Sequence, residues 1–294
     1  MDFGYTKEEE EFRQKLCAFL DKELTEEIAR QNWEDKGVGP EARQFSRQLA
    51  DNGFLGMSWP KEYGGQGLAS TYDFILLDEL GKRWGAHIPL DVGYTMVAHT
   101  ILRRGSEMMK REFLPRIIRG EIEFCLGYTE PNAGSDLASM KMRAVEEGDD
   151  FLINGQKTFN TEAHYAEYHW LAARTDFSPN IPKHRGISLF IVDMNSPGIT
   201  VRPLITMSGE RTNEVFYENV RVPKDRLVGE KNKGFYYMME AIDSERNHVF
   251  TPGRLLPILE DLIRYVKETK FMGKPLAEDP LIRDKLAQAA IELE

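Results

Sequence analysis

The segment GYTEPNAGSDL, residues 127–137, gathers side chains that could bind or act on a small molecule. Its glycines and Pro131 favour a tight, exposed turn that directly follows an apolar, strand-like stretch. Such a turn presents backbone N–H groups beside the hydroxyls of Thr129 and Ser135, which suits a polar ring edge or a phosphate oxygen. An ordinary turn, closed by a hydrogen bond from its own Asn or Asp side chain, is the alternative.

A second candidate is INGQKTFNT, residues 153–161. The pair Asn154-Gly155 predicts a hairpin turn, after which Phe159 and Thr161 would share one face of the returning strand. An aromatic ring beside a hydroxyl suits a flat heteroaromatic cofactor, because one stacks and the other forms a hydrogen bond. A core phenylalanine beside a neutral threonine is the alternative.

The third candidate is AIDSERN, residues 241–247, where Asp243, Glu245 and Arg246 interrupt an otherwise apolar helix. Burial would raise the pKa of a carboxylate that faces inward there, so that it could serve as a general base. A surface glutamate paired with a neighbouring Lys or Arg is the alternative.

Other familiar motifs are missing from the sequence. The glycines of YGGQG, residues 63–67, lack the strand, helix and third glycine of a dinucleotide-binding loop. The six histidines show no i, i+4 pair, so we expect no metal site. No Gly-x-Ser-x-Gly nucleophile elbow is present.

Composition narrows the class of protein. The 294 residues are 41% hydrophobic and carry a net charge of −10, which disfavours broad binding to nucleic acid or an anionic membrane. The two cysteines suggest a reducing compartment, and the acidic start MDFGYTKEEEE lacks the apolar core of a secretion signal. Since no apolar run reaches the length of a membrane span, we expect a soluble cytoplasmic protein.

The elements that must position these candidates come in three parts. Helical spacing of apolar residues predicts an N-terminal α-helical domain over residues 1–122. A middle antiparallel β-sandwich or barrel is expected over 123–231, where turn signals separate EFCLGYT, FLINGQKTFN, HWLAART, GISLFIVDM, GITVRPLITM and NEVFYENVRV. Helical spacing returns over 232–294 and predicts a C-terminal α-helical bundle.

The chain as a whole resembles the acyl-CoA dehydrogenase family. Matching segments occur in order along nearly the whole sequence: WPKEYGGQGL, GSEMMKREFLPRIIRGE, TEPNAGSDL, INGQKTFNT, TNEVFYENVRVP and LVGEKNKGF. The resemblance implies bound FAD, an acyl-CoA substrate, an electron-transfer flavoprotein as electron acceptor, and a homo- or hetero-tetramer.

The resemblance also implies roles for the first two candidates. Thr129 and the backbone near Tyr128 would meet the pyrimidine side of the flavin, and Ser135 would face its phosphates and the incoming thioester. Thr161 matches the residue whose hydroxyl points at flavin N5. Phe159 takes the place of a usual tryptophan, which keeps an aromatic surface but loses the indole N–H.

The implied reaction is α,β-dehydrogenation of the thioester, in which a carboxylate removes the α-proton. Most family members place this base late in the C-terminal bundle, whereas a minority place it in an apolar-D-x-E-R pattern. Residues 242–246 match the minority pattern, so Glu245 is expected to be the base, with Arg246 supporting the site and the substrate. A base beyond Glu294 is the alternative.

Two departures from the family pattern keep other functions open. The sequence ends at Glu294, inside the expected second bundle helix, which suggests a fragment or a truncated product. KETKFMGKPL, residues 267–276, lacks an arginine that many relatives direct at the flavin pyrophosphate, although Lys270 or Lys274 could substitute. The alternatives are a non-catalytic partner subunit of a mixed oligomer and a flavin oxidase or monooxygenase on the same scaffold.

Overall fold

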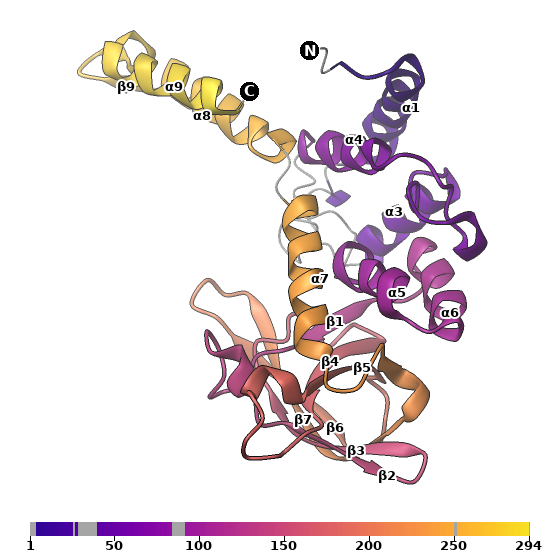
Figure 1. Cartoon of the computed structure of the whole chain (residues 1–294). Coiled ribbons are helices and arrows are strands. Elements are labelled where there is room, and N and C mark those ends of the chain that lie inside the picture. Colours follow the sequence, from indigo (N-terminus) through magenta and orange to yellow (C-terminus); the bar gives the residue numbers. More distant parts are fainter. Residues whose placement is uncertain (1–3, 26, 29–39, 84–91, 250–251, 294) are drawn as a thin grey trace. The chain divides into compact units, whose positions relative to one another are not determined.

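The computed structural model of the chain describes residues 4–25, 27–28, 40–83, 92–249 and 252–293 (Figure 1). The chain divides into two compact units. The first comprises Met1–Trp59, Gln66–Pro89 and Asn247–Glu294, and the second comprises Pro60–Gly65 and Leu90–Arg246. Along the chain the elements follow the predicted order of helices, strands and helices.

The first unit is helical in its described parts. Its helices are α1 (Lys7–Glu23), α3 (Pro40–Asp51), α4 (Ser70–Gly81), α8 (Leu256–Glu268) and α9 (Pro280–Leu293), with a small hairpin of β9 (Lys270–Phe271) and β10 (Lys274–Pro275) between the last two. Thr6 caps α1 and forms a capping box with Glu9, which satisfies the backbone N–H groups at the start of the helix. Apolar residues at helical spacing form its core: Leu16, Leu20, Phe45, Leu49, Leu76 and Leu80.

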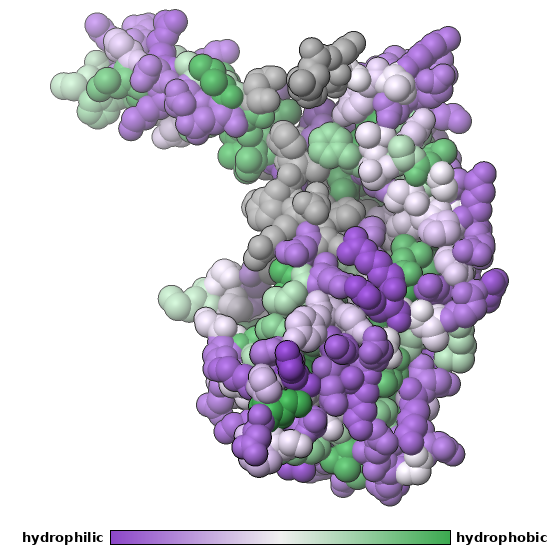
Figure 2. All heavy atoms as spheres, viewed as in Figure 1, coloured by the Kyte–Doolittle hydropathy of each residue, from purple (hydrophilic) through white to green (hydrophobic). Residues whose placement is uncertain are grey.

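The α8–α9 part of the first unit shows hydrophobic side chains among hydrophilic ones (Figure 2). The exposed apolar residues in this part are Leu255, Ile258, Leu262, Tyr265, Phe271, Met272, Leu281 and Ile291. None of the described helices combines the length and apolar character needed to cross a membrane.

Helices precede and follow the strands of the second unit. A π-helical segment (Gly93–Val97) leads into α5 (Ala98–Arg104), which is followed by α6 (Glu107–Ile118), and α7 (Gly234–Val249) comes after the strands. Gly105 ends α5, and the Ser106 hydroxyl accepts a hydrogen bond from the Met109 N–H to cap α6.

The strands of the second unit form one sheet with the order β6-β7-β3-β2-β4-β5-β8, and β1 pairs with β4 (Figure 1). They are β1 (Phe124–Gly127), β2 (Arg143–Glu147), β3 (Asp150–Lys157), β4 (Tyr168–Arg174), β5 (Ile187–Asp193), β6 (Ile199–Ile205), β7 (Arg211–Pro223) and β8 (Leu227–Val228). Strand β4 runs parallel to β1 and β2. All other neighbouring strands, including β4 and β5, are antiparallel. Long crossovers permit these parallel pairs, because a chain needs many residues to return in the same direction.

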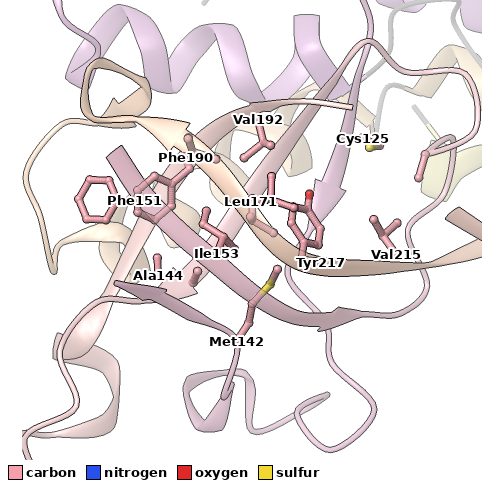
Figure 3. Packing of buried hydrophobic residues seen from close by; sticks show 14 of the residues in the cluster. Cys125, Met142, Ala144, Phe151, Ile153, Leu171, Phe190, Val192, Val215 and Tyr217 are labelled. Carbon is pink, nitrogen blue, oxygen red and sulfur yellow. The ribbon is translucent and has the colours of Figure 1, made fainter. Parts of the chain in front are cut away.

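A continuous apolar core covers this sheet (Figure 3). Phe151 and Phe190 meet edge to face with ring centroids 4.9 Å apart, and Leu171, Val215 and Tyr217 pack in the same cluster. Alternation along β3 directs Phe151 and Ile153 to this core. The same alternation places Lys157, at the end of the strand, on the inward face.

The predicted hairpin at Asn154-Gly155 is wrong. Strand β3 runs straight through this pair, and the turn that joins β2 to β3 lies at Gly148 instead. The register with β7 shifts between Ile153 and Gly155, so the pair forms a β-bulge. A Cβ on Gly155 would lie 2.8 Å from Met142 Cγ, so the glycine is required by close packing.

This bulge changes the setting of the second candidate segment. Because β3 ends at Lys157, Phe159 and Thr161 lie in the loop after it and not on a returning strand. The prediction that these two residues share a strand face is therefore also wrong.

Candidate functional site

The two candidate segments meet in the second unit, one at the end of β1 and the other at the end of β3. We call residues 128–142, after β1, the first loop, and residues 158–164, after β3, the second loop. The Thr158 N–H donates to the Thr129 carbonyl across 2.9 Å, which joins the two loops directly. The sequence therefore singled out two segments that the fold places side by side.

A buried ion pair holds the first loop against β3. The Lys157 ammonium is fully buried and lies 2.9 Å from Glu130 Oε1 and 3.0 Å from the Tyr128 carbonyl oxygen. The Glu130 carboxylate also accepts the backbone N–H groups of Lys141, at 2.6 Å, and Met142, at 3.0 Å. The Lys157–Glu130 pair thus contacts both the beginning and the end of the first loop.

Burial lowers the pKa of Lys157 to about 8, against the opposing attraction of Glu130. Neither Lys157 nor Glu130 was singled out from the sequence. The available signal was a lysine at an inward position of an alternating strand, because such a residue must bury its charge beside a partner.

The tip of the first loop is a backbone-closed turn. Glu130 and Ala133 exchange hydrogen bonds of 3.1 Å and 3.0 Å between their N–H and carbonyl groups. The Asp136 carboxylate pairs with Lys183 and does not close the turn. Arg174 supports the far end of the loop by donating to the carbonyls of Ala138, at 2.8 Å, and Met140, at 3.1 Å.

The outward side of the two loops presents hydroxyl groups and an aromatic ring that could contact a ligand. Among the described residues, none forms a hydrogen bond with the hydroxyls of Thr129, Ser135 or Thr161. Ser135 and Thr161 are exposed, and a Cβ on Gly134 would meet no atom within 4 Å. The Phe159 ring is 60% exposed.

Phe159 is also strained, because its φ of 57° lies in the left-handed region. This conformation costs a bulky residue about 1–2 kcal/mol. A large apolar ring held outward on a strained backbone, together with hydroxyls that bond no residue in the described ranges, fits a flat ligand with a polar edge. The donor set is thus compatible with a flavin ring.

Tyr128 contributes backbone and not an outward side chain. Its ring is 8% exposed, and its hydroxyl accepts a hydrogen bond from Trp170 Nε1 across 2.9 Å. The His169 ring packs against Gly127, the residue before Tyr128. A Cβ on Gly127 would lie 2.4 Å from His169 Nε2. Burial lowers the pKa of His169 to about 3, so this ring is a neutral part of the wall.

The third candidate segment lies on α7 (Figure 1). The side chains of Glu245 and Arg246 fall outside the described part of the structure, so their predicted roles stay predictions. The helix itself is fixed to its own unit, since the Arg104 guanidinium bonds the Glu240 carboxylate at 2.5 Å and 3.1 Å. Within the described ranges, no three His, Cys, Asp or Glu side chains gather as a metal-binding group.

Comparison with known proteins identifies the fold and its lineage. Family models of acyl-CoA dehydrogenases match the chain over residues 6–121 for the N-terminal domain, 125–220 for the middle domain and 232–294 for the C-terminal domain. The chain belongs to the acyl-CoA dehydrogenase family. The predicted class, with helical, β-sheet and helical parts in that order, is confirmed, although the sheet is mixed and not purely antiparallel.

Individual relatives agree with this assignment. Acyl-CoA dehydrogenase FadE26 of Mycobacterium tuberculosis is 37% identical over 277 residues, 93% of this chain and 69% of that protein. FadE29 of the same organism is 43% identical over 224 residues, 76% of this chain and 57% of that protein. The solved ChsE4-ChsE5 complex from Mycobacterium tuberculosis superposes with a TM-score of 0.85 at 36% identity, covering 100% of this chain and 74% of that chain. This acyl-CoA dehydrogenase family chain therefore spans about two thirds of these relatives.

Proposed function

We propose that the protein catalyses FAD-dependent α,β-dehydrogenation of an acyl-CoA thioester. Family membership supports the reaction class. The observation that carries the proposal is the outward side of the two loops, where an exposed Phe159 at positive φ accompanies hydroxyls that bond none of the described residues. FAD, when bound, would accept the hydride from the β-carbon of the substrate.

The two loops would hold the flavin by distinct contacts. Thr129 and the backbone near Tyr128 are proposed to bond the polar pyrimidine edge, and Phe159 to cover a ring face. The Thr161 hydroxyl would lie at the reacting side of the ring, while Ser135 would meet the phosphates and the thioester. The buried Lys157 keeps the first loop in place without touching the ligand.

The proton transfer is assigned to α7. Glu245 is proposed to remove the α-proton of the thioester, and Arg246 to support the charge that develops and to contact the substrate. In support, residues 242–246 carry the apolar-D-x-E-R pattern and lie on α7. A carboxylate that takes a proton from carbon works best when its own pKa is raised by an apolar setting.

An electron-transfer flavoprotein is the proposed acceptor, because family members commonly pass their electrons to one. A tetramer is proposed on the same ground. A second candidate function is a non-catalytic partner subunit, since the similar ChsE4-ChsE5 structure is a complex of two different chains.

The test is to load the purified protein with FAD, add acyl-CoA thioesters of several chain lengths without oxygen, and record the visible absorbance of the flavin. Dehydrogenation predicts bleaching with at least one thioester. Glu245→Gln should abolish bleaching if the chain is the catalyst, and Asp243→Asn is the matched control on the same helix. Flavin that binds but never bleaches would favour the partner subunit, and oxygen consumption without an added acceptor would favour an oxidase.

A further inference from the structure

Asn213 of β7 is fully buried and makes a reciprocal contact with the second loop. Its side-chain Nδ2 donates to the Asn160 carbonyl across 2.9 Å, and the Asn160 N–H donates to the Asn213 carbonyl across 2.9 Å. The same Nδ2 lies 3.1 Å from His164 Nδ1. One buried amide therefore contacts the loop at two points, four residues apart.

The direction of these hydrogen bonds is determined by the neighbours of Asn213. Arg211 Nε donates to Asn213 Oδ1 across 3.1 Å, so the amide nitrogen must be the atom that faces the loop. An amide nitrogen can only donate, which makes His164 Nδ1 the acceptor and leaves the ring proton on Nε2. Burial and the charge of Arg211 lower the pKa of His164, which keeps the ring neutral and able to accept.

The contact at Asn160 reaches both halves of the candidate site. Asn160 lies between Phe159 and Thr161, the two residues assigned to the flavin. Its own Nδ2 donates to the Leu126 carbonyl of β1 across 2.6 Å, two residues before Tyr128. Asn213 thus holds Asn160, and Asn160 joins the second loop to the strand that carries the first.

We infer that Asn213 is a positioning residue, which fixes the second loop so that Phe159 and Thr161 face a bound ligand. The consequence for flavin binding rests on the proposed function, whereas the clamp on the loop does not. A strained φ of 57° at Phe159 needs such a clamp, because a free loop would relax the backbone and turn the ring away. The buried amide supplies directed hydrogen bonds where an apolar residue would supply none.

The decisive variant is Asn213→Asp, which keeps the size and the oxygen that accepts from Arg211 but removes the donor toward the loop. Amide hydrogen exchange of the protein without FAD is the first measurement. We expect residues 158–164 to exchange at least tenfold faster, since two hydrogen bonds of about 1 kcal/mol each are lost, while β4 and β5 keep their wild-type rates. Asn195→Asp is the matched control, because Asn195 and His164 line one pocket of about 440 Å³ but Asn195 bonds only Asp193 among the described residues.

His164 provides a rescue test. His164→Asn retains an acceptor near the position of Nδ1 and should keep the slow exchange of the loop, whereas His164→Ala should accelerate it by a few fold. Equal acceleration in all strands of the unit by Asn213→Asp would overturn the inference, because it would make Asn213 an ordinary stabilising residue. Wild-type exchange of the loop in that variant would overturn it as well.

The second measurement is FAD affinity, followed by flavin fluorescence. Asn213→Asp should weaken FAD binding about tenfold, and Asn195→Asp should leave it unchanged. Wild-type affinity in Asn213→Asp, together with a faster loop, would overturn the positioning role. Failure of the wild-type protein to bind FAD would instead refute the proposed function, while the exchange experiment would still decide the clamp.

Discussion

The two loops of the candidate site are held in different ways. The first loop depends on a charge pair, in which a fully buried Lys157 meets Glu130. The second loop depends on neutral groups, in which Asn213 bonds Asn160 and His164. Both devices fix connections between strands, and the first loop includes a short 3-10 helix at Leu137–Ser139.

The difference has an energetic meaning. A buried charge cannot lose its partner without a large penalty, so Lys157 and Glu130 admit almost no alternative arrangement of the first loop. Neutral hydrogen bonds contribute about 1 kcal/mol each. Releasing the second loop therefore costs less free energy than releasing the first. The second loop is also the one with the strained Phe159. A buried charge pair thus holds the first loop, and directed neutral hydrogen bonds hold the second.

Removal of the buried ammonium should have the largest effect. Lys157→Met leaves the Glu130 carboxylate buried without its partner and should lower the free energy of unfolding by about 3–5 kcal/mol. Chemical denaturation measures this loss. The double variant with Glu130→Gln should recover part of it.

A surface pair provides the control for Lys157. Arg221 is 55% exposed and pairs with Glu147 and Asp150, so Arg221→Met should cost less than about 1 kcal/mol. Equal losses for the Lys157 and Arg221 variants would contradict the assigned role of the buried pair.

A methyl group at the base of the first loop should have the next largest effect. Gly127→Ala places a Cβ 2.4 Å from His169 Nε2 within a packed wall and should destabilise the fold by about 1–3 kcal/mol. Gly134→Ala, where a Cβ meets no atom within 4 Å, should change the stability by less than about 0.5 kcal/mol. Similar unfolding temperatures for both variants would show that the His169 ring moves to accommodate the added methyl group at little cost.

The two histidines beside the loops should respond differently to acid. Burial lowers the pKa of His169 from 6.5 to about 3. At pH values between these two, His169 is protonated in the unfolded chain but neutral in the folded chain. The contribution of His169 to stability is therefore complete above pH 6.5 and is lost as the pH falls toward 3, by up to about 1.4 kcal/mol per pH unit.

Urea denaturation across this pH range checks the acid response. His169→Gln should flatten the dependence, because glutamine does not titrate. His164→Gln should flatten it less, since His164 is only half-buried. An unchanged slope in His169→Gln would show that other groups cause the acid sensitivity.

The smallest effect concerns the strained ring. Phe159→Gly and Phe159→Ala both remove the ring, but only glycine accepts the φ of 57° without strain. The glycine variant should therefore be the more stable of the two by about 0.5–1 kcal/mol, the reverse of the usual order. Calorimetry without FAD compares them, and a more stable alanine variant would show that the loop relaxes. Both variants should bind FAD more weakly than the wild type.

Much of this structure was predictable because it depends on near neighbours in sequence. Thr6 begins a helix through its own capping box, and Gly105 ends another. The strand segments and the turn at 127–137 follow from alternation and from turn-forming residues. The resemblance carried by TEPNAGSDL and INGQKTFNT pointed to the family, which comparison with known proteins confirms.

Only the tertiary structure decided the rest, because it depends on residues far apart in the chain. Asn154-Gly155 has the local signature of a hairpin, yet the register with β7 and the packing of Met142 make it a bulge. Lys157 and Asn213 look ordinary in sequence, since their partners Glu130 and Asn160 stand 27 and 53 residues away. Local propensity determines which elements form, whereas buried polar groups obtain their partners only when the sheet is assembled.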